Sequence, residues 1–427
     1  MGRIGLLAIP TALAAKAKEL ISSSVVKSTL RTDLDKIFFY SWKAGTFETG
    51  PTKTVQDGAP PSAVAKAESL NTRLILNYGP RESVAYTAVQ FPRSYAAISA
   101  ILSRSRDRLF QGEINTITDF ACGPGTGIWA AVDFGLPIKQ ATAIDTSESM
   151  LDLTQDFAKS LYPSIQDSIT YKRYLDGVKT PDSDMVIAAY ALSQLPGTAV
   201  IDDSVTKLWN RVRPGGYLLV LERGTPDGFE IVKRARESIA IKDFADECEV
   251  IAPCTHAFAC PVSGKDWCHF SQRLQRPKYM MNLKKSKSNR EDVKYSYILL
   301  RKHTAVLDRQ SVPGAHIPVP SASVQAEPMM RRVTAPPLKR KAHVSLDTCA
   351  ANGRLERVTL AKSSGEAYSR ARKSYWGDLW QQEGGSVVPR VRNVEQEAAE
   401  AAAQQQEDRS KPYARKRVGE IDFTQCG

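Results

Sequence analysis

Short β-rich runs alternate with longer amphipathic segments across residues 114–222 of this 427-residue chain. Two parallel neighbouring strands need a crossover connection between them, and that crossover is usually a helix. Strand–helix alternation at this spacing therefore predicts an α/β protein with a doubly wound parallel sheet. The predicted strands are 117–122, 141–145, 184–190 and 216–222, and the predicted helices between them are 147–162 and 198–212.

A glycine-rich turn follows the first predicted strand in ITDFACGPGTGIWAA, residues 117–131. Gly123 and Gly125 let the backbone bend sharply, and they let a ligand approach without meeting a Cβ atom. The next strand ends in Asp145, where an acid can accept hydrogen bonds from both ribose hydroxyls of a nucleoside. Together with VRPGGYLLVLERG at 212–224, these features predict a nucleotide-type cofactor site.

This pattern resembles the class I S-adenosylmethionine-dependent methyltransferases, whose first motif reads roughly D-x-G-x-G-x-G. Ala121 stands where that motif has its first glycine, and its methyl group narrows the expected pocket. A dinucleotide site is the weaker alternative, because its G-x-G-x-x-G pattern does not fit this turn. The cofactor-binding candidates are Asp119, Ala121, Gly123, Gly125 and Asp145.

The segment after the predicted strand 184–190 gives no sign of catalysis. Amino-group methyltransferases of this class carry an acid or Asn followed by Pro-Pro and an aromatic residue there, and the cytosine-C5 type carries Pro-Cys. The chain has AAYALSQLPG at 188–197, with neither arrangement. We therefore predict no catalytic residue and expect a methyltransferase scaffold retained for its shape.

Three of the seven cysteines crowd into residues 254–268. Few, clustered cysteines in a long chain are typical of a reduced compartment and a metal site rather than a disulfide framework. The gaps between these three are wider than the roughly two to four residues that separate paired zinc ligands. Zinc, an iron–sulfur cluster and buried free thiols all stay open on spacing alone. The predicted thiols are Cys254, Cys260 and Cys268, and the candidates for a fourth ligand are His256, His269, Cys248 and Cys349.

Positive charge is concentrated in the second half of the chain. From Ser271 to Trp380 there are 22 Lys and Arg against 8 Asp and Glu, a net 22 − 8 = +14. The whole chain carries +12, so the remaining residues sum to 12 − 14 = −2. This asymmetry, and the mixing of arginines with aromatics in YSRARKSYWGDLW at 368–380, indicate a binder of polyanions, although charge runs are often only solvated faces.

The ends of the chain give weaker signals. The first 31 residues are basic and nearly free of acids, as transit peptides are, but an amphipathic helix that begins at Pro10 fits them as well. The chain has no apolar run of about eighteen residues, so no membrane span is predicted. The predicted divisions are a helical region 1–110, a Rossmann-like core 111–245, a cysteine and basic-strand segment 246–303, a Pro-rich linker 304–330, a basic segment 331–385 and a peripheral helix and tail 386–427.

The longer motifs resemble a single family. Its signatures are DFACGPGTGIWAA, ERGTPDGF, APCTHAFACPVSGKDWCHFSQRLQR, KYSYILLRK, PPLKRKAHVSLDTC and ARKSYWGD, which together span roughly residues 80–380. They look like the methyltransferase-like ribosomal small-subunit proteins of bacteria and mitochondria. The resemblance implies a mitochondrial protein that binds the small ribosomal subunit during assembly. The implied partners are small-subunit rRNA, small-subunit ribosomal proteins and other assembly factors.

The resemblance also implies a 4Fe–4S cluster, with zinc as the alternative metal, held by Cys254, Cys260, Cys268 and Cys349. Cys349 would then staple the basic piece 331–362 onto the loop 250–276, with His256 and His269 as donors to sulfur rather than ligands. An active rRNA methyltransferase and a zinc-stabilised rRNA-binding protein stay open as alternative functions. The expected RNA contacts are Arg273, Arg276, Lys339, Arg340, Lys341, Arg372 and Lys373.

Overall fold

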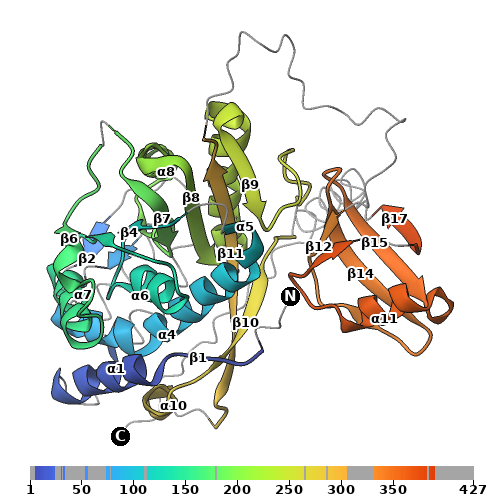
Figure 1. The fold of residues 1–427 in the computed structure, drawn as a ribbon. Coiled ribbons are helices and arrows are strands. Elements are labelled where there is room, and N and C mark those ends of the chain that lie inside the picture. The colour runs from blue at the N-terminus through green and yellow to red at the C-terminus, as the bar shows by residue number, and fades with distance from the viewer. Residues whose placement is uncertain are drawn as a thin grey trace, which may run out of the picture.

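The computed structural model shows two units, a large α/β unit and a smaller β unit formed by the C-terminal part of the chain (Figure 1). Most of the predicted linker 304–330 and of the predicted tail 386–427 lies outside the described residues. The structure describes residues 5–24, 30, 32–33, 53–55, 74–76, 78–109, 113–177, 180–263, 266–284, 287–304, 330–381 and 384–389.

Five parallel strands form the centre of the α/β unit in the order β8-β7-β4-β5-β6. The predicted doubly wound parallel sheet is therefore confirmed. The fifth of these strands, β6, was not predicted, because it has four residues of which only Ile169 is buried, too short a run for a periodic signal. The strands are β4 (Thr116–Phe120), β5 (Gln140–Ile144), β6 (Ile169–Lys172), β7 (Ser183–Ala189) and β8 (Val212–Arg223). The connecting helices are α6 (Thr126–Asp133), α7 (Glu148–Leu161) and α8 (Thr198–Arg211).

The sheet continues past β8 with antiparallel strands. β11 (Arg290–Lys302) pairs with β8, and β9 (Cys248–Ala252) and β10 (Phe270–Gln275) both pair with β11. A short strand, β1 (Leu7–Ala8), adds to the edge of β10. The segment 246–303, predicted as a separate division, therefore belongs to the main sheet, because the buried middle of β11 needs a neighbour on each edge.

Helices cover both faces of this sheet. On one face, α4 (Pro80–Arg104) and α1 (Thr11–Ser24) pack with α6 and α7 around a core that includes Leu13, Ile98 and Trp129. On the other face, α8 and α9 (Pro226–Glu237) cover a second core around Trp209.

α1 begins directly after Pro10, as its apolar spacing predicted. The remaining elements of this unit are α5 (Arg106–Leu109), α10 (Lys278–Lys284) and the paired strands β2 (Lys53–Val55) and β3 (Leu74–Leu76). Among the described helices, none is long and apolar enough to span a membrane.

The C-terminal module, residues 330–389, is an antiparallel sheet with one helix, α11 (Glu366–Lys373), packed against it. Among its described residues, the apolar core consists of seven buried side chains, including Leu346 and Trp380. So small a core gives little stability to a unit of this size, so the module depends on its contacts with the α/β unit. The strands are β12 (Met330–Val333), β13 (Leu338–Lys339), β14 (His343–Ala350), β15 (Leu355–Ala361), β16 (Leu379–Gln381) and β17 (Ser386–Pro389).

Candidate metal centre, cofactor site and basic face

The cysteine loop, residues 253–269, interrupts one strand position of the main sheet. A strand has only two edges, and β8 occupies one edge of β11, so β9 and β10 share the other. The chain leaves the sheet after Ala252 and returns at Phe270, which places the loop opposite the middle of β11. There the Ser296 hydroxyl donates to the carbonyl oxygen of Cys268 over 2.8 Å.

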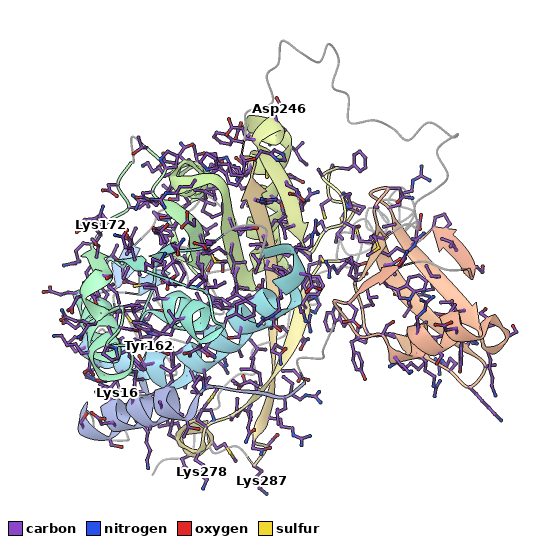
Figure 2. The ribbon with its side chains drawn as sticks, viewed as in Figure 1. Lys16, Tyr162, Lys172, Asp246, Lys278 and Lys287 are labelled. Atoms are coloured by element: carbon purple, nitrogen blue, oxygen red, sulfur yellow. The ribbon has the colours of Figure 1, made fainter. Side chains whose placement is uncertain are left out.

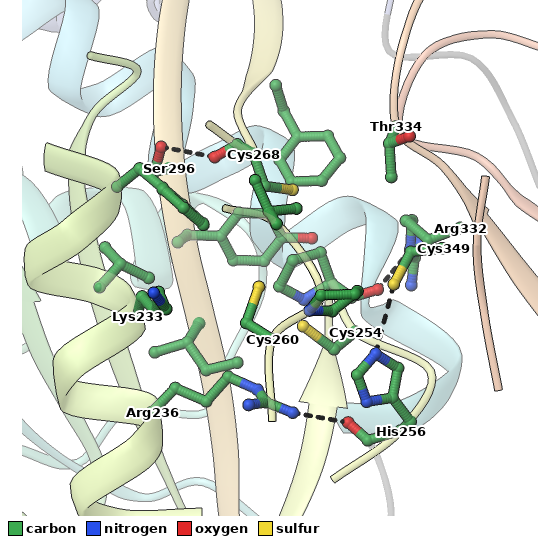
Figure 3. Close-up of a pocket in the computed structure, with 18 residues that line it drawn as sticks. Lys233, Arg236, Cys254, His256, Cys260, Cys268, Ser296, Arg332, Thr334 and Cys349 are labelled. Atoms are coloured by element: carbon green, nitrogen blue, oxygen red, sulfur yellow. Dashed lines mark hydrogen bonds between the residues drawn. The ribbon is translucent and has the colours of Figure 1, made fainter. Parts of the chain in front are cut away.

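Four cysteines line one cavity at the junction of the two units (Figure 3). Cys254, Cys260 and Cys268 come from the cysteine loop, and Cys349 comes from β14 of the C-terminal module. The Thr255 hydroxyl donates to the carbonyl oxygen of Cys349 over 3.4 Å, which joins the loop to that strand. The structure thus brings together the four predicted thiols from segments about eighty residues apart, while Cys248 is not among the lining residues.

The four cysteines that line the cavity are free thiols, partly or fully buried. None of the six described cysteines forms a disulfide. Burial raises the pKa of Cys260 to about 11 and raises the pKa of Cys268 and Cys349 above the usual range. Within the described residues, no three Cys, His, Asp or Glu side chains gather closely enough to hold one metal ion. A single zinc ion would draw its four sulfurs to within about 3.8 Å of one another, because each Zn–S bond is about 2.3 Å.

The two nearby histidines have different positions. His256 is buried, and its Nε2 lies 3.3 Å from Cys349 Sγ, in reach of a hydrogen bond to sulfur. Burial, reinforced by the charge of Arg236, lowers the pKa of His256 to about 4, so the ring is neutral at physiological pH. His269 is not among the residues that line the cavity; its ring packs edge-on against Trp376 at 4.7 Å.

The glycine-rich turn has the strained geometry that its sequence predicts. Ala121, Gly123 and Gly125 all have a positive φ, of 52°, 54° and 76°. A Cβ atom on Gly125 would lie 2.8 Å from Trp129 and Thr154, so only glycine fits there. Ala121 adopts the left-handed conformation despite its side chain, which is unfavourable by roughly 1–2 kcal/mol. Its methyl group therefore adds backbone strain to a turn whose family pattern has glycine.

The two predicted acids hold the turn in place. Asp119, buried at the end of β4, accepts a hydrogen bond from the Gly127 N–H over 2.8 Å. Asp145, directly after β5, accepts from the N–H groups of Gly123 and Ser147, each over 2.9 Å. Each carboxylate oxygen can accept more than one hydrogen bond, so Asp145 keeps acceptor capacity for ribose hydroxyls. The candidate cofactor residues thus lie together at the carboxyl ends of two adjacent parallel strands.

Asp119→Asn is expected to make stability less sensitive to pH. Burial raises the pKa of Asp119 from 3.8 to about 7. The folded state therefore binds this proton more tightly than the unfolded state, so the carboxyl lowers the free energy of unfolding as pH rises from about 4 to about 7. Urea unfolding across this range should show the Asp119→Asn variant gaining stability over the parent as pH rises. Asp152→Asn, on the exposed side of α7, is the control, and a pH-independent difference for Asp119→Asn would contradict the assignment.

Two buried polar side chains, which the sequence analysis did not single out, lie beside this site. Tyr190 follows β7 directly, has a φ of 58°, and its hydroxyl has no partner among the described residues. Glu222, at the end of β8, accepts from the Ser193 N–H over 3.0 Å, while within the described chain its second oxygen is unbonded. Burial raises the pKa of both groups. The position of Tyr190, immediately after a strand of the parallel sheet, is the signal that could have drawn attention to it.

Five of the seven predicted RNA contacts form one exposed basic face on the C-terminal module. They are Lys339, Arg340, Lys341, Arg372 and Lys373. The guanidinium of Arg372 donates to the carbonyl oxygen of Arg340 over 3.2 Å, which joins α11 to the end of β13. The Lys339 ammonium lies 4.9 Å from the ring centroid of Tyr375, which is 38% exposed. By contrast, Trp380 belongs to the module core and Trp376 packs against the core of the α/β unit.

The other two predicted RNA contacts lie in the α/β unit, Arg273 on β10 and Arg276 directly after it. Arg273 is paired with Asp292 at 2.7 Å and Arg276 with Glu291 at 2.9 Å, so neighbouring acids offset their charge. Lys278 and Lys287 lie near the same end of the sheet, away from the C-terminal module (Figure 2). The predicted basic surface is therefore divided between two regions of the molecule.

Comparisons with known proteins identify the family. A family model described as Mitochondrial small ribosomal subunit Rsm22 matches residues 80–381. The human protein named Ribosome assembly protein METTL17, mitochondrial, is 29% identical over 317 residues, covering 71% of this chain and 63% of that one. The Schizosaccharomyces pombe protein named Rsm22-cox11 tandem protein 2, mitochondrial, is 28% identical over 330 residues, covering 70% of this chain and 43% of that one.

A crystal structure of the N-methyltransferase NodS from Bradyrhizobium japonicum WM9 with S-adenosyl-L-homocysteine covers 50% of this chain and 88% of that one, at 12% identity and a TM-score of 0.31. The chain spans under half the length of the fission-yeast relative. The mitochondrial location expected from the sequence agrees with the family description and with the names of the relatives. Because the family model matches most of its length, the chain belongs to the mitochondrial small ribosomal subunit Rsm22 family.

Proposed function

We propose that this chain is a mitochondrial assembly factor of the small ribosomal subunit that binds rRNA through the basic face of its C-terminal module. One observation carries the proposal: the thiols of both units line one cavity at their junction. A group held there would fix the RNA-binding face relative to the methyltransferase-like unit. Family membership supplies the ribosomal context, and the human relative is named a ribosome assembly protein. Ribosomal proteins of the small subunit and other assembly factors are the proposed further partners.

The group proposed for the cavity is a 4Fe–4S cluster bound by Cys254, Cys260, Cys268 and Cys349. Four thiols with no acidic neighbour in the described lining are the donor set such clusters use. Buried thiols give up their protons to a metal, so binding would couple to the fold of the junction. When bound, the cluster would supply iron–thiolate bonds that hold the two units together. Zinc is the alternative metal, because four thiolates can also hold one tetrahedral zinc ion.

The basic face fits the phosphate backbone of RNA. Its lysines and arginines are exposed and come from two segments that fold beside each other. Lys and Arg neutralise phosphates and release counterions, which makes such binding strong at low salt and weak at high salt. The exposed Tyr375 beside them offers a ring on which an unpaired base can stack. Arg273 and Arg276 are proposed as weaker contributors, because each shares its charge with an acid.

The cofactor site is proposed to hold S-adenosylmethionine without turning it over. Gly123 and Gly125 keep the turn open to a ligand, and Asp145 lies where ribose hydroxyls would bind. An active rRNA methyltransferase is the second candidate function. Two features of Tyr190 favour it: a positive φ, and a buried hydroxyl that has no hydrogen-bond partner among the described residues. Tyr190 lies at the carboxyl end of β7, where the substrate of such an enzyme would approach.

Co-sedimentation and methyl transfer together test these functions. The purified chain is mixed with small-subunit precursors and S-adenosylmethionine that carries a labelled methyl group. We expect the chain to co-sediment without transferring label to rRNA. Transfer of label that Asp145→Ala abolishes and the exposed Asp152→Ala preserves would establish the methyltransferase instead. Failure to co-sediment would refute both functions.

A further inference from the structure

The cavity that the four cysteines line is reached by buried cationic side chains. Its described lining includes Lys233, Arg236 and Arg332, and it includes no Asp or Glu. Buried charges in folded proteins are normally paired, because removing an ion from water is costly. Lys233 is paired with Glu230 at 3.6 Å, outside the lining. The two arginines have no ion pair with an acid among the described residues, so their buried charge calls for an anion.

Arg236 reaches the cavity from α9 and is only partly satisfied there. It is 2% exposed, and its Nη2 donates to the carbonyl oxygens of His256 and Phe258 over 3.0 and 2.5 Å. These two bonds hold the cysteine loop against the helix. Its Nε and Nη1 are buried and find no acceptor in the described part of the chain. Buried donors without acceptors are rare in native proteins, and an absent ion is one of their ordinary explanations.

Arg332 reaches the same cavity from β12 of the C-terminal module. It is 7% exposed, and it donates to the carbonyl oxygens of Pro253 over 2.6 Å and Gly377 over 2.9 Å. The first of these bonds crosses from one unit to the other, next to Cys254. Both acceptors are neutral carbonyl groups, and no acid in the described part of the chain forms an ion pair with Arg332.

The arginine next to Arg332 on β12 is also buried, but it is paired with an acid. Arg331 is 3% exposed and forms an ion pair with the buried Glu356 of β15. Alternate residues of a strand point to opposite sides, so Arg331 and Arg332 face different surroundings. One meets a carboxylate inside the module, and the other meets the thiol cavity. The contrast indicates that a group bound in the cavity supplies the negative charge that balances Arg332.

We infer that Arg236 and Arg332, one from each unit, are the counter-charges of the anionic group that the four cysteines hold. This inference rests on the proposed cluster. A 4Fe–4S core of charge about +2 with four thiolates carries about −2, which two arginines balance. The two side chains lie on different sides of the thiols (Figure 3), so the anion would attract both units toward itself. The free N–H groups of Arg236 would donate to its sulfur atoms. The junction is thus held by charge as well as by metal–thiolate bonds.

The experiment compares cluster retention and reduction potential in the full chain, purified without oxygen. Arg236→Met and Arg332→Met remove each charge, and Arg236→Lys and Arg332→Lys keep it. Arg234→Met is the matched control, because Arg234 lies on the same helix but is paired with Asp202. We expect iron loss to EDTA to be roughly tenfold or more faster in each Met variant, and closer to native in the Lys variants.

The reduction potential separates an electrostatic role from a structural one. In a dithionite titration the cluster accepts one electron and becomes more negative, so loss of a nearby cation should shift its potential to more negative values. Lys at either position should restore most of this shift. Iron loss and potential equal to those of Arg234→Met would overturn the inference while leaving the cluster in place. A native chain that contains no iron and no acid-labile sulfide would refute the proposed cluster and the inference together.

Discussion

Replacing Cys349 by serine is expected to release the C-terminal module from the α/β unit and to abolish association with the small ribosomal subunit. In the described structure, Cys349 is the one cavity-lining cysteine that the module supplies. The basic face lies on that module, so its orientation depends on the joint. Without the metal–thiolate link through Cys349, mainly the polypeptide connection would attach the module and its basic face to the α/β unit.

The expected effect is large because the module has few other sources of stability. Its apolar core has seven buried side chains. A cross-link that closes a loop of about eighty residues restricts the unfolded chain by about 4–5 kcal/mol, which is a large share of the stability of an ordinary domain. The remaining cross-unit bonds, such as those of Thr255 and Arg332, contribute about 1–3 kcal/mol each. They do not replace the staple.

The measurement combines iron content, limited proteolysis and co-sedimentation with small-subunit precursors. Cys349→Ser and Cys254→Ser should lose iron, expose the 330–389 module to protease and remain in the unbound fraction. Cys248→Ser is the control, because Cys248 is buried on β9 but is not among the residues that line the cavity. If Cys349→Ser co-sediments as well as the native chain does, the stapling argument is wrong.

Reversing charge at Lys339, Arg340 and Arg372 is expected to weaken rRNA binding by roughly a hundredfold at moderate salt. The three side chains are exposed and lie together, so they can contact neighbouring phosphates. If each neutralises one phosphate, their loss lowers the slope of log affinity against log salt by about 2–3. Glu at all three positions also repels the RNA, which adds to the loss.

Binding isotherms at several salt concentrations would measure both quantities. Arg273→Gln is the matched comparison, because Arg273 is exposed but shares its charge with Asp292. We expect a loss of only a fewfold for Arg273→Gln. A triple variant with native affinity and native salt slope would rule out the basic face as the RNA site. Circular dichroism and thermal unfolding would show that the triple variant keeps its fold, since all three positions lie on the surface.

Local sequence patterns determined the parts of the fold that local physics controls. The alternation of β-rich and amphipathic segments was sufficient to predict β4, β5, β7 and β8 and their parallel arrangement, because buried parallel strands are short apolar runs separated by helices. The glycines and acids of the turn could also be identified from the sequence, because a positive φ and a close backbone approach each require a particular residue type.

Other features needed the folded chain. The cysteine loop interrupts a strand position beside β11, and no short window of sequence shows which strand occupies which edge. The buried roles of Arg236 and Arg332 were missed for the same reason, because their surroundings come from residues distant in sequence. Arg273 and Arg276 counted toward the basic surface until the structure showed the acids beside them.

The sequence by itself thus determined the fold class, the nucleotide-type turn and the residue types of the thiol site. The tertiary structure brought Cys349 to the cysteine loop, where spacing alone had left four candidates for the fourth ligand. It alone decided that the basic residues form two regions instead of one, and that the cavity between the units has no acid in its described lining. Periodicity and residue choice reflect interactions within a few positions of the chain. The meeting of the four thiols and the charge balance of the cavity depend on segments that only folding brings together.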